Sequence, residues 1–378
     1  MRNPAGPHAP SAALAFLDST GGPLAPMKPK VLYVPRRVFG RKPTLRKWLK
    51  RWWSGKRFAG QEGFFQAAVH SAFDVEETTL EALPARTRAD RSVCAVIVDW
   101  QCGENGSLAG VSELRTVTKI SVPAVLFCGN ACAGFMPKDD VLDLFSLVFK
   151  REPFKDLDRY LISSSNKAKI HPTMLACKGI PMNSRTLYNL VVEYYGRDRY
   201  GTDFNSDVFF LGQATHMNRI ETIQAIKRLG IRFQGGIYPL SKRVQEREKT
   251  VIPISDYSDV FHAKIKSDRY FDFLCTSKIN LVLSGFGEFT FRHQEAWLYS
   301  CFTLCESDIE ELNLLIRVKP YEHYVPFRGL TDLIEKIQYY IDDMDERRRI
   351  AENARRQFVQ DYSVLKHGKD IKAVIQTL

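Results

Sequence analysis

The 378-residue sequence lacks any uninterrupted apolar run of roughly 18–20 residues, the length that a membrane-spanning helix needs, so it predicts no such helix. Its eight cysteines include no CxxC pair. The two Cx3C spacings, Cys128/Cys132 and Cys301/Cys305, have no histidine partner at zinc-site spacing. Most of the cysteines lie in apolar runs, which is typical of buried, reduced thiols. We therefore expect a cytoplasmic protein with no metal site.

Acidic residues are missing from one basic segment. Residues 36–57 contain ten Lys or Arg and no Asp or Glu, whereas the rest of the chain has 44 basic and 43 acidic residues. The net charge of +11 therefore resides in one local patch. This distribution argues against a protein that coats nucleic acid along its whole surface.

The composition is that of a globular protein, with 44% hydrophobic and 26% charged residues. The length suits two domains of about 150 residues each. Residues 1–28 are rich in Pro, Ala and Gly, and their apolar run, Ala12–Leu17, is shorter than the core of a signal peptide. We interpret this stretch as a disordered leader.

Strands and helices alternate in both halves of the chain. In the first half, strands are predicted at Lys30–Val34, Val93–Trp100 and Val122–Cys128, with a helix at Phe64–Phe73. Continuous apolar strands separated by helices are typical of a parallel sheet covered on both faces.

The second half repeats this pattern. Strands are predicted at Asp207–Gly212 and Ile279–Ser284, a helix starts with Asn218 as its N-cap, and further helices cover Thr331–Ile341 and Asp343–Tyr362. The fold class is therefore α/β with two Rossmann-like domains facing a cleft. The predicted parts are the leader 1–28, an N-terminal domain 29–195, a C-terminal domain 196–345, and a C-terminal helix, 346–378, that closes on the N-terminal domain.

The most informative window follows the strand that ends at Ser284. Gly285, Phe286 and Gly287 form a turn whose backbone N–H groups can approach a phosphate closely, next to the N-terminus of a helix. Arg292 can pair with a diphosphate, and Glu295 can accept hydrogen bonds from a ribose diol. The alternative is an ordinary tight turn with a capping Glu.

A second turn supplies candidates for the same anion site. These residues are Gly212, Gln213, His216 and Arg219, which follow the strand that ends near Gly212. Lys278, just before its strand, is a weaker candidate because such a lysine is usually solvated. His216 and His293 are each predicted to lie in a loop facing the cleft.

The segment Arg292-His293-Gln294-Glu295-Ala296-Trp297 resembles the R-x-x-E-A pattern of GT-B glycosyltransferases of the group-1, spore-maturation-like type. The likeness covers roughly residues 205–362. It implies a GT-B fold, a nucleotide-sugar donor as co-substrate with no further cofactor, and a ribose-binding role for Glu295. Retaining members of this group carry two Glu separated by seven residues, and the earlier position here is Gly287.

A second likeness lies further along the chain. Lys319–Pro326, which reads KPYEHYVP, resembles a segment of protein O-glucosyltransferase-like, capsule-associated enzymes, which also have a GT-B architecture. Both likenesses imply the same class of chemistry.

The resemblance also directs attention to a catalytic base. An inverting transfer needs a group that deprotonates the acceptor hydroxyl, and Asp99, at the end of the strand Val93–Trp100, is the candidate. The alternative is a strand-end Asp that caps a turn. Asp156-Leu157-Asp158 is a weak match to a metal-binding DxD motif, but GT-B enzymes generally stabilise the diphosphate without a metal.

The basic segment has an amphipathic pattern. The apolar residues Leu45, Trp48, Leu49 and Trp52 recur at helical spacing, and the basic residues Arg46, Lys47, Lys50 and Arg51 point elsewhere. This pattern is typical of a helix lying on an anionic membrane surface. A core-packed helix and a nucleic-acid arm are the alternatives, although no nucleic-acid motif accompanies the segment.

The sequence thus predicts a cytoplasmic glycosyltransferase, peripheral on the inner face of the membrane. It would move a sugar to a glycan, lipid-linked or protein acceptor in surface polysaccharide or glycoconjugate biosynthesis. A catalytically inactive GT-B scaffold is the alternative. A dinucleotide-dependent oxidoreductase is disfavoured because no GxGxxG follows the first strand.

Overall fold

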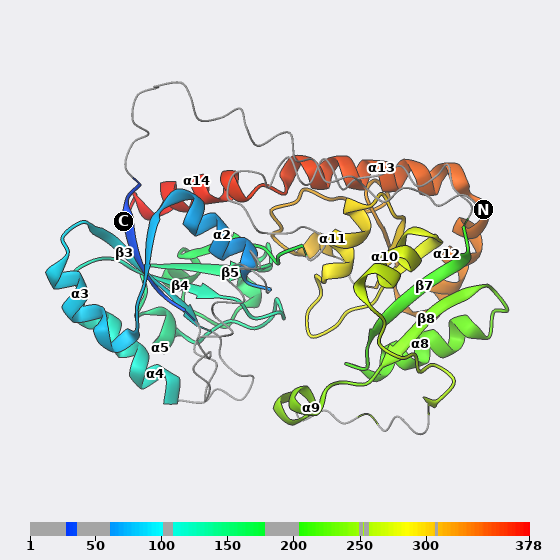
Figure 1. Cartoon of the computed structure of the whole chain (residues 1–378), viewed down its shortest axis with the longest axis horizontal. Helices are drawn as coiled ribbons and strands as arrows, with labels where there is room; N and C mark the ends of the chain where they lie inside the picture. Colours follow the sequence, from blue (N-terminus) through cyan, green and yellow to red (C-terminus); the bar gives the residue numbers. More distant parts are fainter. Residues whose placement is uncertain are drawn as a thin grey trace, which may run out of the picture.

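The computed structural model describes residues 28–35, 61–100, 109–177, 204–248, 252, 257–306 and 309–378. Two parallel β-sheets lie side by side, each covered by helices (Figure 1). No helix in the described part of the chain has the length and apolar character needed to cross a membrane. The strands are β1 (Lys30–Val34), β2 (Asp74–Glu77), β3 (Val93–Trp100), β4 (Ala124–Cys128), β5 (Leu147–Arg151), β6 (Ile170–Thr173), β7 (Ser206–Gln213), β8 (Phe233–Tyr238), β9 (Ser277–Val282), β10 (Thr303–Cys305) and β11 (Val325–Pro326).

The first sheet has the order β2-β1-β3-β4-β5-β6, and every neighbouring pair is parallel. Alternate residues of its strands face opposite helical layers, so both faces are apolar. Tyr33 and Ile97 belong to the cluster that also contains side chains of α2 and α14, whereas Leu32 and Val96 pack with Leu83 of α3.

The α-helices are α2 (Gly63–Ala72), α3 (Leu83–Ala89), α4 (Ala109–Leu114), α5 (Asp139–Leu142), α6 (Ser164–Lys167), α8 (Met217–Lys227), α9 (Lys242–Glu248), α10 (Ser267–Cys275), α11 (Phe291–Leu298), α12 (Gly329–Asp342), α13 (Met344–Asp361) and α14 (Val364–Ile375).

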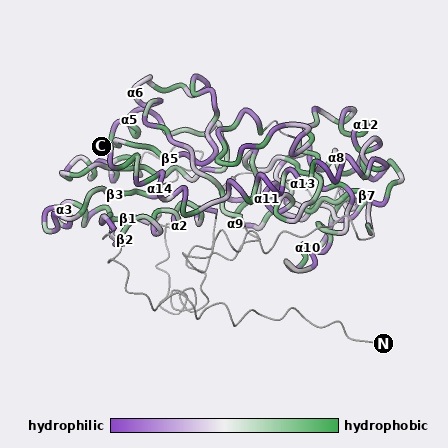
Figure 2. Tube along the Cα trace, turned by 90° about the horizontal axis from the view of Figure 1, so that it is seen from above, coloured by the Kyte–Doolittle hydropathy of each residue, from purple (hydrophilic) through white to green (hydrophobic). Residues whose placement is uncertain are grey.

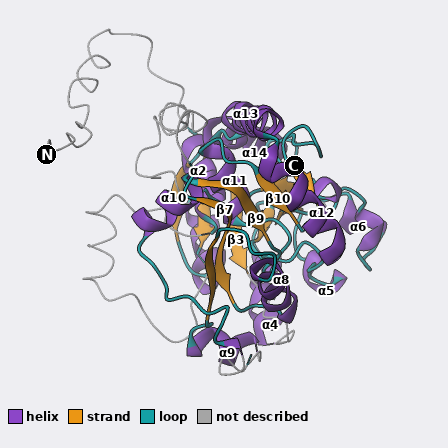
Figure 3. Cartoon of the chain, turned by 90° about the vertical axis from the view of Figure 1, so that its right-hand side faces the viewer, coloured by secondary structure: helices purple, strands orange, loops and turns teal. Residues whose placement is uncertain are grey.

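The second sheet has the order β11-β10-β9-β7-β8 and is also parallel throughout. One face packs against α8 and α12, and the other packs against α10 and α11. Seen end-on, helices surround the strands (Figure 3). The α/β class with two Rossmann-like sheets is confirmed.

The predicted strands and helices agree with the structure to within a few residues, with two differences. Helix α8 begins at Met217, with extended backbone at His216, so Asn218 lies inside the helix and is not its N-cap. The C-terminal region forms two helices, because Ser363 interrupts the chain after α13 and its side chain accepts a hydrogen bond from the N–H of Lys366 at the start of α14.

The two C-terminal helices lie over different lobes. Helix α13 lies over the second sheet, and α14 continues across the first, where it packs against α2 (Figures 1 and 2). The predicted domain boundary at residue 195/196 falls outside the described residues, as do residues 1–27 of the predicted leader 1–28.

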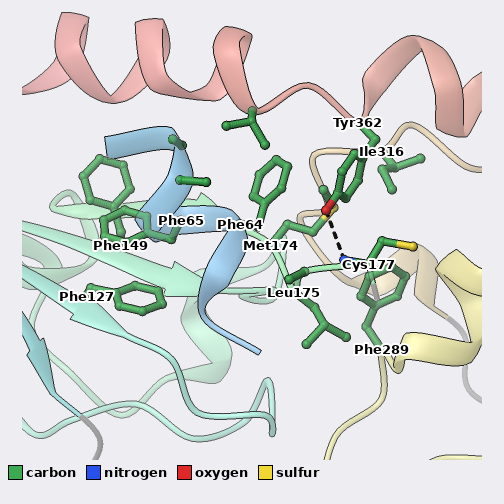
Figure 4. Close-up of a cluster of buried hydrophobic side chains, with 14 of the residues drawn as sticks. Phe64, Phe65, Phe127, Phe149, Met174, Leu175, Cys177, Phe289, Ile316 and Tyr362 are labelled. Atoms are coloured by element: carbon green, nitrogen blue, oxygen red, sulfur yellow. Dashed lines mark hydrogen bonds between the residues drawn. The ribbon is translucent and has the colours of Figure 1, made fainter. Parts of the chain in front are cut away.

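One aromatic cluster joins the lobes where α13 meets α14. The Phe64 ring of α2 lies 4.8 Å from the Tyr362 ring (Figure 4). It is also stacked on the ring of His367. The hydroxyl of Tyr362 accepts a hydrogen bond of 3.0 Å from the N–H of Cys177. The same cluster includes Phe289 from the segment before α11. The apolar core is therefore continuous from one sheet to the other.

Replacing Phe64 by Ala should destabilise the protein strongly. Its side chain is fully buried, so the loss includes both transfer energy and a cavity, and the free energy of unfolding should fall by about 3–5 kcal/mol. Guanidinium denaturation measures this change. Leu161→Ala is the control, because Leu161 is fully exposed and its loss should change stability by less than about 0.5 kcal/mol. Equal effects of the two substitutions would contradict the shared core.

Candidate functional site

Arg219 joins the carboxyl ends of two strands of the second sheet. Its Nε donates to the carbonyl of Ser284 at 2.7 Å, Nη1 to that of Gln213 at 2.8 Å, and Nη2 to that of Leu283 at 2.9 Å. Burial, with a smaller contribution from the nearby Arg292, lowers the pKa of Arg219 to about 9. Because each of its three nitrogens donates to a backbone carbonyl, Arg219 holds the two turns together and places its charge between them.

Two glycines make room for Arg219, namely Gly212 near the end of β7 and Gly285 in the turn after β9. A Cβ on Gly212 would lie 2.7 Å from the Phe210 ring and 3.2 Å from Nη1 of Arg219, and one on Gly285 would lie 3.1 Å from Nη2. His216 lies near the same turn, with its Nε2 2.6 Å from the carbonyl oxygen of Gly285. Its ring meets Phe286 edge-on, with centroids 6.3 Å apart. The two predicted turns therefore form one unit.

Arg292 lies in the first turn of α11, beside Arg219. Its guanidinium carbon is 4.4 Å from the centre of the Phe210 ring, and that of Arg219 is 5.6 Å from it. Nη2 of Arg292 donates to the carbonyl of Leu211, and Nε has no hydrogen-bond partner among the described residues although the residue is only 9% exposed. Within the described ranges neither arginine forms an ion pair with a carboxylate. Two buried cations therefore lie together, with the carboxylates of Glu306 and Glu295 nearby.

Glu295 is the third polar residue of this group. It lies one turn into α11, not in its first turn, and its Oε2 accepts a hydrogen bond of 2.9 Å from the hydroxyl of Tyr270 on α10. Burial, followed by the charge of Glu295, raises the pKa of Tyr270 far above its ordinary value. The sequence analysis missed Tyr270, since nothing in its local pattern distinguishes it from other aromatic residues of a helix.

Two predicted members of the site lie elsewhere. Lys278 is near the start of β9, at the amino edge of the sheet, where its Nζ is 3.0 Å from the carboxylate of Asp207. The prediction that Lys278 binds the nucleotide sugar is wrong, because ligands of a parallel sheet bind at the carboxyl edge. His293 is not in a loop either. It is 1% exposed in α11, and its Nδ1 accepts from the N–H of Thr290.

Gly287 faces the other sheet. A Cβ at this position would lie 2.0 Å from the backbone oxygen of Ala131 in the β4–α5 loop. The next side chain, Glu288, accepts a hydrogen bond of 3.0 Å from the N–H of Ala133. The expectation that Gly287 opens the turn to a phosphate is wrong, since backbone of the N-terminal lobe occupies that space. The carboxyl edges of the two sheets therefore meet here.

Asp99 lies at the carboxyl end of β3 and is 4% exposed. Its Oδ2 accepts from the Tyr33 hydroxyl at 3.2 Å and from the Gln66 amide at 3.4 Å. The weak DxD match is a structural turn, because Asp156 accepts from the N–H of Asp158. No cluster of three or more metal-ligating side chains occurs in the described part of the chain.

The end of β5 holds buried charges that the sequence analysis missed. Nζ of Lys150 donates to the carbonyls of Asn130 and Cys132, both at 3.2 Å. Arg151 donates from Nε to Glu152 at 2.9 Å, and Glu152 has a left-handed backbone with φ of 42°. Burial lowers the pKa of Lys150 and raises that of Glu152. The apolar strand before them gave no signal for this group.

The membrane-contact residues predicted from the sequence lie outside the described residues. These are Leu45, Arg46, Lys47, Trp48, Leu49, Lys50, Arg51 and Trp52.

Comparison with known proteins supports the resemblance found in the sequence. Residues 219–371 match the family model described as glycosyl transferase-like. A search of curated proteins finds no match to the chain. Among solved structures, HepE from Anabaena, crystallised with UDP and glucose, is 12% identical with a TM-score of 0.53, covering 92% of this chain and 100% of its own.

Two further structures have the same fold. Sucrose-phosphate synthase from Thermosynechococcus elongatus is 9% identical with a TM-score of 0.55, covering 93% of this chain and 99% of its own. A glycosyltransferase from Rickettsia africae is 12% identical with a TM-score of 0.53, covering 93% of this chain and 98% of its own. The GT-B architecture and the likeness to group-1 glycosyltransferases are therefore confirmed.

Stability should fall in mild acid because of two buried histidines. Burial lowers the pKa of His293 and of His367 to about 3, from an ordinary value of 6.5. Below pH 6.5 the unfolded chain binds protons that the folded chain excludes. The free energy of unfolding should then fall by about 1.4 kcal/mol per pH unit for each histidine, from pH 6.5 towards pH 3.

Guanidinium denaturation between pH 7.5 and 5 tests this dependence. A His367→Gln variant should be less stable at pH 7.5 but should lose stability less steeply as the pH falls. An unchanged slope in this variant would exclude His367 as a contributor.

Proposed function

We propose that this chain is a glycosyltransferase that moves a sugar from a UDP-linked donor to a hydroxyl group of a glycan, lipid-linked or protein acceptor. The observation that carries the proposal is the pair of buried arginines, Arg219 and Arg292, at the carboxyl edge of the second sheet, with Nε of Arg292 left without a hydrogen-bond partner among the described residues. A diphosphate is the anion that this charge suits. The choice of UDP follows from HepE, which was crystallised with UDP and glucose.

The proposed roles follow the contacts of each residue. Arg292 has an unpartnered Nε and binds the diphosphate directly, and Arg219 adds charge and fixes the turns that surround it. When the bond from the sugar to the diphosphate breaks, negative charge grows on the leaving oxygen, and fixed cations lower the energy of that state. These two cations would serve the purpose without a metal ion.

Glu295 is assigned to the ribose diol, with Tyr270 holding one of its oxygens in place. Asp99 is the proposed base, since it lies at the end of β3, at the edge of the first sheet that meets the turn after β9. This turn carries Gly287 and Glu288 and is called the donor turn below. Asp99 would take the proton of the acceptor hydroxyl in an inverting transfer. The pathway proposed is surface polysaccharide or glycoconjugate biosynthesis, which was inferred from the sequence resemblance.

Donor binding should raise the melting temperature of the purified chain. UDP-glucose at 100 times its dissociation constant should stabilise the folded state by about 2.7 kcal/mol, without Mg2+. Arg292→Ala should abolish the shift, and Glu295→Ala should weaken it. Arg228→Ala, an exposed arginine at the end of α8, is the matched control and should keep the shift.

Other nucleotide sugars, linked to GDP, ADP, CMP or dTDP, belong in the same screen. A shift with another base would replace UDP in the proposal. Millimolar donor without any shift would favour the catalytically inactive scaffold.

Peripheral attachment to an anionic membrane is proposed from the sequence of the basic segment. Each basic residue near a charged bilayer contributes about 1 kcal/mol, so the double substitution Lys47→Glu and Lys50→Glu should weaken binding at least about 25-fold. Sedimentation with vesicles containing phosphatidylserine measures this. Lys264→Glu with Lys266→Glu, at exposed positions of the C-terminal lobe, is the control. Equal binding by both double variants would reject the segment as the anchor.

A further inference from the structure

The donor turn after β9 touches the N-terminal lobe at two adjacent residues. The carboxylate of Glu288 accepts from the N–H of Ala133, and Gly287 lies directly against the carbonyl of Ala131. Both partners belong to the loop that follows β4, at the carboxyl edge of the first sheet. The contact therefore joins the carboxyl edge of the second sheet, proposed to bind the sugar donor, to the carboxyl edge of the first sheet, proposed to bind the acceptor.

Each side of this contact is held by its own lobe. In the N-terminal lobe, Lys150 donates to the carbonyls of Asn130 and Cys132, and the hydroxyl of Tyr160 donates to that of Ala133 at 2.8 Å. These bonds fix the backbone that Glu288 meets.

In the C-terminal lobe, Arg219 donates to the carbonyl of Ser284, and Glu306 accepts from the Ser284 N–H at 2.8 Å. The turn that carries Gly287 and Glu288 is thus anchored at Ser284, three to four residues upstream. Movement of either backbone would break bonds within its own lobe.

Glycine is required at position 287 because the turn comes so close to the backbone of Ala131. A Cβ would stand 2.0 Å from a backbone oxygen, and backbone cannot move aside as the end of a flexible side chain can. Any other residue at 287 would separate the turn from the loop of residues 131–133.

The lobes are also joined away from this point. Residues 153–155 pair with residues 311–313 through the Lys155 N–H to the Glu311 carbonyl, at 2.8 Å, and the Asn313 N–H to the Pro153 carbonyl, at 2.7 Å. Gln294 of α11 donates to the carbonyl of Leu175 at 2.9 Å. Loss of the Glu288 contact would therefore free the turn locally while the two lobes stay attached.

From these contacts we infer that Gly287 and Glu288 form a positioning pair that fixes the donor turn against the acceptor lobe. The inference rests on the proposed function. Glu288 does not bind the nucleotide in this assignment. It sets the distance and angle between the donor sugar and the acceptor hydroxyl, and small errors in that geometry slow a transfer strongly. The pair should therefore act on kcat and leave donor affinity unchanged.

The test compares Glu288→Ala with Glu288→Gln, whose amide oxygen can still accept from Ala133. With Ala, kcat should fall about tenfold or more while the Kd for UDP-glucose stays within about twofold, and Gln should restore most of the rate. Hydrogen exchange at the Ala133 amide should quicken by at least about tenfold in Glu288→Ala and stay near wild type in Glu288→Gln.

A second pair of variants tests the glycine. Gly287→Ala should lower kcat as Glu288→Ala does. Gly134→Ala is the control from the opposing loop, because its Cβ would make only ordinary contacts, at 3.7 Å to Cys132 and 3.8 Å to Phe154.

Unchanged kcat and unchanged hydrogen exchange at the Ala133 amide in Glu288→Ala would overturn the inference. A Kd for UDP-glucose that rises by the same factor as kcat falls would also overturn it. Hydrogen exchange is measured without any nucleotide sugar present. If the wild-type chain bound no nucleotide sugar, the proposed function would fail while the exchange data still decided whether the contact exists.

Discussion

The packing of α14 on α2 is the constraint on which the rest of the structure depends. The chain leaves the C-terminal lobe through α13, turns at Ser363 and covers the first sheet with its last helix. Tyr362 stands at this crossing, with its ring against Phe64 and its hydroxyl on the Cys177 backbone. Because the apolar core passes through this point without a break, the two carboxyl edges are held facing each other. The proposed donor and acceptor sites owe their proximity to that packing.

Much of the fold could be predicted from the sequence because its strands are continuous apolar runs. Runs such as Val93–Trp100 have few alternatives to a buried parallel strand, and the glycine-containing turns after β7 and β9 identify the edge where ligands bind. Arg292 and Glu295 were found from the same logic, since Arg292 lies in the first turn of the helix that follows such a turn and Glu295 lies one turn further along. Their burial and their closeness to Arg219 agree with a shared site.

The remaining features depend on contacts between distant residues, which no local pattern encodes. Arg219 is present in the predicted turn, but its use of three carbonyls is visible only once β7 and β9 lie side by side. Tyr270 meets Glu295 from another helix, and Glu288 meets Ala133 from another lobe. Lys278 is different, because its place before a strand already assigned it to the amino edge. Its distance from the ligand edge was therefore predictable from strand direction alone.

The crossing of α14 also limits how the two halves can be treated as modules. The acceptor-side lobe is completed by residues from the far end of the chain, so its sequence is discontinuous and the donor-side lobe is inserted within it. A chimaera that exchanges one lobe for that of another GT-B protein must take α2 and α14 from the same parent, or their apolar faces will not match. The two helices therefore form one packing unit although about 290 residues separate them.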